Sequence, residues 1–82
     1  MIDAKLLASA IERMEAEIAL FPESEFPVEH EQTRAVVAAA KAYEPLRAAL
    51  DALGEAIAEA DELDDPPIFD AMAKAAAALN QN

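Results

Sequence analysis

The chain has 82 residues, with 17 carboxylates against six Lys and Arg, a net charge of −11, and no cysteine. Nucleic acid and anionic lipid repel such a polyanion, and without thiols the chain can form neither a disulfide framework nor a thiolate metal site. Alanine is abundant and Gly54 is the one glycine, so the composition predicts a single helical domain over residues 1–82 with a thin core.

A first helix is predicted over residues 3–20 from apolar residues that recur at spacings of four and three. Asp3 fits the N-cap, and Pro22 ends the helix because the residue before a proline is pushed out of helical geometry. The stripe must face another apolar surface and consists of Leu7, Ile11, Met14, Ile18 and Phe21.

A connection with two prolines leads to a second helix, which has Pro27 in its first turn and runs to about Tyr43. Phe26 and Val28 are expected to lie beneath this connection. Pro45 removes a helical hydrogen bond, so the chain either kinks there or starts a new helix. The expected inner face consists of Val36, Val37, Ala40 and Tyr43.

A third helix is predicted over residues 46–63, with an apolar stripe on one side and acids on the other. The acids fall within an arc of about 80°, and neighbours are about 4.5–6 Å apart along the axis. The stripe is Leu46, Leu50, Leu53, Ile57 and Ala60. The acids are Asp51, Glu55, Glu59 and Glu62.

A fourth helix is predicted over residues 66–79, and its alanine-rich end can approach a neighbour closely. Its expected inner face is Phe69, Met72, Ala76 and Leu79. The four segments predict an all-α fold, a small bundle of three to four helices. The first and third helices, which have matching stripes, are the expected central pair.

The segment 61–70, DELDDPPIFD, holds five carboxylates and two prolines. Asp65 before Pro66 fits an N-cap followed by proline at the first helical position, which favours a solvated helix junction. A calcium loop would need a central glycine, which is missing here. Paired carboxylates can serve acid–base catalysis in a cleft, but a small alanine-rich bundle offers little material for one.

The remaining polar residues give no catalytic signature. His30 lies between Glu29 and Glu31, but adjacent helical residues do not face each other, so an exposed histidine in a first turn is expected. Tyr43 is expected in the core with its hydroxyl at the edge. No nucleophile elbow or phosphate loop occurs, so we expect no enzyme, no cofactor and no bound metal.

The start of the chain, MIDAKLL, lacks a basic leader, and the apolar run at residues 35–40 is too short to span a bilayer. These features favour a soluble cytoplasmic protein that binds neither membranes nor nucleic acid directly.

The charge therefore favours a basic protein, or a nucleic-acid-binding complex, as the partner. In size and charge only, the chain resembles small phage-encoded inhibitors that mimic nucleic acid, including some anti-CRISPR proteins. The alternative is a structural or assembly module that forms a homodimer through its apolar helix faces. The predicted partner-binding residues are Asp51, Glu55, Glu59, Asp61, Glu62, Asp64, Asp65 and Asp70.

Overall fold

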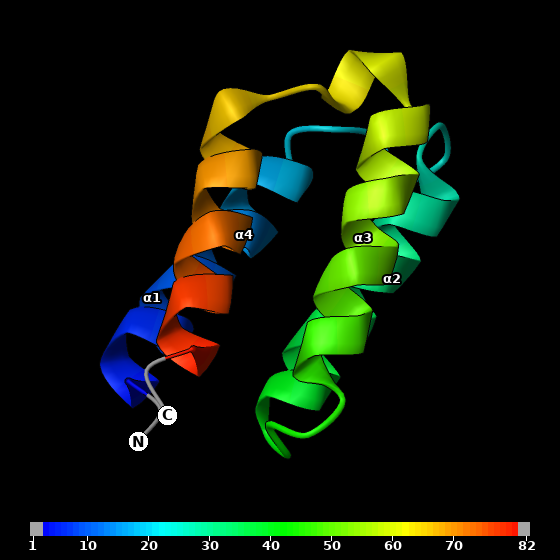
Figure 1. The fold of residues 1–82 in the computed structure, drawn as a ribbon. Coiled ribbons are helices and arrows are strands. Elements are labelled where there is room, and N and C mark those ends of the chain that lie inside the picture. Colours follow the sequence, from blue (N-terminus) through cyan, green and yellow to red (C-terminus); the bar gives the residue numbers. More distant parts are fainter. Residues whose placement is uncertain (1–2, 81–82) are drawn as a thin grey trace.

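The chain folds into four helices joined by short connections in a computed structural model that describes residues 3–80. The elements are α1 (Ala4–Ile18), α2 (Pro27–Ala40), α3 (Leu46–Glu59), the short 3₁₀ helix η1 (Asp61–Leu63) and α4 (Pro66–Leu79). Their up-down-up-down order places the start of α1 and the end of α4 at one end of the bundle (Figure 1). Residues 3–80 contain no strand, and the predicted all-α bundle is confirmed.

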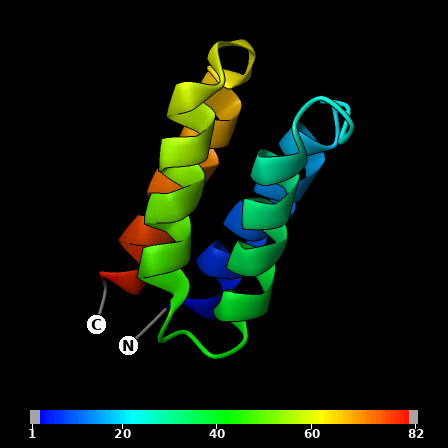
Figure 2. The ribbon, with the colours of Figure 1, turned by 90° about the vertical axis from the view of Figure 1, so that its right-hand side faces the viewer.

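The helices associate as two pairs. α1 makes its most extensive contact with α4, and α2 with α3, while the contacts of α1 with α2 and of α3 with α4 are smaller. Figure 2 shows α2 and α3 side by side, with α1 and α4 behind them. The predicted pairing of the first and third helices is wrong, because α1 and α3 lie diagonally across the bundle. An apolar stripe can pack against any other stripe of the same spacing, so the sequence pattern did not identify which helix is the neighbour of α1.

Large aliphatic side chains from all four helices and η1 fill the core. The apolar stripes predicted for α1 and α3 are largely confirmed, since most of their residues are buried. Burying one such side chain contributes about 1.5–3 kcal/mol relative to leaving it exposed. The large side chains that are at most 1% exposed are Met14, Val36, Leu46, Leu53, Ile57, Leu63 and Ile68.

The helix starts mostly follow the sequence signals. The Asp3 carboxylate accepts a hydrogen bond from the Leu6 backbone N–H at 3.0 Å, as expected of an N-cap. Pro27 is the first residue of α2, and the buried Phe26 packs edge-on against Phe21, with ring centroids 5.5 Å apart. Val28, however, is 52% exposed rather than covered by the connection.

The turn between α2 and α3 departs from the prediction. α2 ends at Ala40, and Tyr43 has a left-handed backbone with φ of 66° while its N–H donates to the Ala39 carbonyl at 2.8 Å. This geometry turns the chain out of the helix, so Tyr43 is 40% exposed and does not belong to the core as predicted. Pro45 is the N-cap of α3, so the chain breaks there and a new helix begins.

α4 has the predicted bounds but buries a different face. The predicted residues Phe69, Met72, Ala76 and Leu79 are only half-buried. The large side chains of α1 fill the space between the two helices, and small residues on α4 allow the backbones to approach. The face at most 1% exposed is shifted by one residue and consists of Ile68, Ala71, Ala75 and Ala78.

A candidate acidic docking surface

The charges of the chain are segregated along the sequence. Residues 14–33 and 48–73 contain 14 carboxylates and no Lys or Arg, whereas the rest of the chain contains all six Lys and Arg and three carboxylates. The topology gathers these two segments at the α1–α2 and α3–α4 connections, together with most of α3 (Figure 1). We call this region the acidic half. Its net charge is −14, while the remainder of the molecule is net +3.

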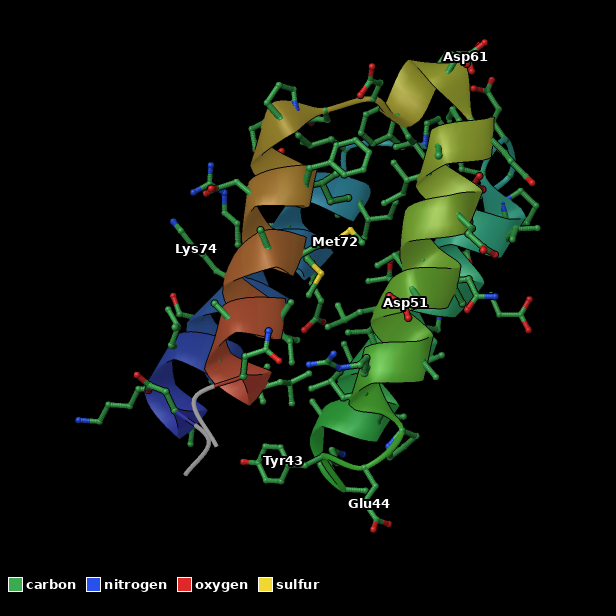
Figure 3. All side chains as sticks on the ribbon, in the orientation of Figure 1. Tyr43, Glu44, Asp51, Asp61, Met72 and Lys74 are labelled. Carbon is green, nitrogen blue, oxygen red and sulfur yellow. The ribbon has the colours of Figure 1, made fainter. Side chains whose placement is uncertain are left out.

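Six of the eight predicted partner-binding residues are exposed and have no ion-pair partner among residues 3–80. Figure 3 shows Asp51 on α3 and Asp61 at the end of the bundle. Because α3 ends at Glu59, Glu62 lies in η1 and does not continue the helical stripe as predicted. These residues are Asp51, Glu55, Glu59, Asp61, Glu62 and Asp64.

The other two predicted partner-binding residues have neighbours within the molecule. Asp70 pairs with a lysine, and Asp65 lies beside α1. The Asp70 carboxylate lies 3.1 Å from the Lys74 ammonium. Asp65 is the N-cap residue of α4, as predicted, but its side chain accepts no capping hydrogen bond. It is half-buried beside Glu17, whose carboxylate lies 3.3 Å from Arg13.

Partial burial raises the pKa of Asp65 above its ordinary value. The neighbouring Glu17 carboxyl raises this pKa further through charge repulsion and a hydrogen bond, while Arg13 lowers it. Asp65 therefore belongs to a contact between α1 and α4, and is the least available of the predicted surface charges.

The α1–α2 connection adds acids that were not among the predicted partner-binding residues. This connection lies at the same end of the bundle as η1 (Figure 1), and it contains the exposed residues Glu23 and Glu25. Arg34 forms an ion pair with Glu23. Leu20, in the same connection, is 74% exposed, so the acidic half also presents a large apolar side chain. In the sequence, segments without Lys or Arg alternate with segments that contain them. This alternation indicates where the acids gather only once the order of the helices in space is known.

His30 is half-buried, and the prediction of an exposed histidine is wrong. Its Nε2–H donates to the Phe21 carbonyl oxygen at 2.8 Å, which ties α2 to the preceding connection. His30 also lines an open groove of about 260 Å³ between α1 and α2, with Glu15 and Arg34. The neighbouring Glu29 is 8% exposed, so this acid is not part of the free surface.

Within residues 3–80, no group of three His, Asp or Glu side chains could hold a metal ion. No helix in the same range has the length and apolar character needed to cross a membrane. Comparison with protein-family models, curated proteins and solved structures finds no match to this chain. The surface charge and shape are therefore the basis for a functional proposal.

Proposed function

We propose that this protein is a non-enzymatic acidic binding protein that inhibits or regulates a partner by docking on its basic, nucleic-acid-binding surface. The observation that supports this most strongly is the concentration of 14 carboxylates, and no Lys or Arg, in the acidic half. A charge that served solubility alone would be equally effective if it were dispersed over the surface.

The acids of this surface are presented on ordered elements. Asp51, Glu55 and Glu59 are four residues apart on α3, which places them about 6 Å apart along the axis. Regularly spaced, exposed carboxylates offer a basic groove the kind of charge array that it meets on a nucleic-acid backbone. Exposed Leu20 adds an apolar contact, which a protein surface can cover.

The experiment that tests the proposal is capture of partners from a lysate of the source cells on immobilised protein, with elution by a salt gradient. We expect a nucleic-acid-binding protein that is eluted by salt and displaced by added DNA or RNA. In the variant Glu55→Gln/Glu59→Gln/Glu62→Gln/Asp64→Asn, which removes four exposed carboxylates, about 0.5 kcal/mol per lost contact would weaken the complex by about thirtyfold.

A matched control separates the acidic half from net charge. Glu55→Gln/Glu59→Gln and Glu12→Gln/Glu44→Gln each remove two exposed carboxylates, the first pair from the acidic half and the second from outside it. The proposal requires that only the first pair lowers the salt concentration at which the partner elutes. Equal shifts for both pairs, or none for the fourfold variant, would show that the acidic half is not the binding surface.

A further inference from the structure

The outer face between α2 and α3 is an open apolar groove. Seven residues line it, six alanines and Pro45, and its volume is about 570 Å³. α2 and α3 stand side by side on this face of the molecule (Figure 2). Ala39 and Ala49 lie deeper in the groove, whereas Ala35, Ala38 and Ala48 are exposed.

The same groove is bordered by carboxylates. Glu31 precedes Ala35 by one helical turn on α2, and Glu55 follows Ala48 by about two turns on α3. Both acids are exposed. The exposed Val28, two turns before Ala35, extends the apolar surface toward the acidic half.

The cations of this part of the chain lie on other faces. Arg34 pairs with Glu23 and lines the groove between α1 and α2. Lys41 lines a second groove beside α1, and Arg47 donates a hydrogen bond to Asn80, just beyond α4. The α2–α3 face is therefore apolar along its centre and negative at its border.

We propose that this groove binds a basic amphipathic α-helix of the partner protein. The apolar face of such a helix would cover the alanines, and its Lys or Arg residues would reach the bordering acids. The groove-lining part of α2 from Ala35 to Ala39 rises about 6 Å, which matches about one turn of a docked helix. This inference rests on the proposed function, because the helix belongs to the basic partner.

A second copy of the chain fits this face less well. An isologous contact would bring the carboxylates that border both grooves together, and the Lys and Arg residues of α2, α3 and their turn point elsewhere. The charge at the border therefore selects a cationic occupant.

The test uses two synthetic peptides of about 14 residues and identical Lys, Leu and Ala composition, one with its leucines on a single helical face and the other scrambled. Binding is measured by isothermal titration calorimetry against the full chain. We expect the amphipathic peptide to bind at least about tenfold more tightly than the scrambled peptide, because only the former matches both the groove and its border.

The variant Ala38→Gln/Ala48→Gln places two polar side chains in the groove at exposed helical positions, where glutamine is a good helix former. It should reduce the affinity ratio of the peptides to about one. The control Ala16→Gln/Ala73→Gln makes the same change at exposed positions of α1 and α4 and should leave the ratio unchanged.

Equal affinities for the two peptides, unaffected by Ala38→Gln/Ala48→Gln, would overturn the docking site and leave the electrostatic function standing. Binding of neither peptide at low salt would contradict the proposed function as well. A homodimer in sedimentation equilibrium that Ala38→Gln/Ala48→Gln dissociates would overturn the proposal by making a second copy the occupant.

Discussion

The two helix pairs use alanine in opposite ways. In the α1–α4 pair, Ala71, Ala75 and Ala78 are buried at 0–1% exposure against the large side chains of α1. In the α2–α3 pair, Leu and Val side chains form the interior, and alanines such as Ala38 and Ala48 face outward. One alanine stripe thus closes a helix contact inside the molecule, and the other leaves an uncovered face. The comparison teaches that a stripe of alanines in the sequence does not by itself show whether these residues close a contact within the chain or stay uncovered.

Ala75→Leu should have the largest effect on this comparison. Ala75 is fully buried in the α1–α4 pair, and a larger side chain would force α1 and α4 apart. We expect the free energy of unfolding, measured by urea denaturation, to fall by about 1–3 kcal/mol. The matched change Ala38→Leu in the exposed α2–α3 groove should alter it by no more than about 0.5 kcal/mol. Equal losses in the free energy of unfolding for the two variants would show that Ala38 is packed as tightly as Ala75.

Tyr43→Gly should stabilise the turn of the α2–α3 pair. The positive φ of Tyr43 strains a residue with a Cβ atom, and glycine relieves that strain at the cost of a more flexible unfolded chain. We expect an increase in the free energy of unfolding of up to about 1 kcal/mol relative to Tyr43→Ala, which removes the ring but keeps Cβ. If the two variants unfold at the same urea concentration, backbone strain at this turn is negligible.

Gly54→Ala tests how tightly the two pairs meet where α3 faces α4. A Cβ atom at position 54 would lie 3.3 Å from Cε of Met72, which is the end of a flexible, half-buried side chain (Figure 3). Because Met72 can move, the helix propensity of alanine should dominate and stabilise the protein by up to about 0.5–1 kcal/mol. A lower melting temperature would instead indicate that the contact between the pairs is rigid.

Asp65→Asn should give the smallest effect, and one that depends on pH. The pKa of Asp65 is raised in the folded state, so the folded protein binds its proton more tightly than the unfolded chain does. Stability therefore falls as pH rises from the ordinary pKa of 3.8 through the raised value, and it stays lower at neutral pH. Asparagine removes the repulsion from Glu17 and remains a good N-cap.

The thermal melting temperature of Asp65→Asn should exceed that of the parent protein at pH 7, and the two should converge below the ordinary pKa. Asp64→Asn, which removes the same charge at an exposed neighbouring position, corrects for the general relief of negative charge. Two results would contradict repulsion by Glu17. One is an increase in melting temperature for Asp65→Asn that is no larger than the increase for Asp64→Asn. The other is an increase that persists in acid.

The sequence by itself determined the helical class, most helix starts and the apolar stripes of α1 and α3. These features depend on interactions within a few residues, such as the Asp3 cap, Pro27 in a first turn and the spacing of Leu46, Leu50 and Leu53. The exposed acids of α3 and η1 could also be predicted, because their spacing places them on the side opposite the apolar stripe.

Only the tertiary structure decided which helices are neighbours, which face of α4 is buried and which acids lie together. The burial of Ala71 and Ala75 in place of Met72 and Ala76 depends on the volume of side chains in α1, which are distant in sequence. The gathering of Glu25 and Asp61 at one end depends on the up-down-up-down order of the helices. Local periodicity contains neither kind of information, since both arise from packing between separate segments of the chain.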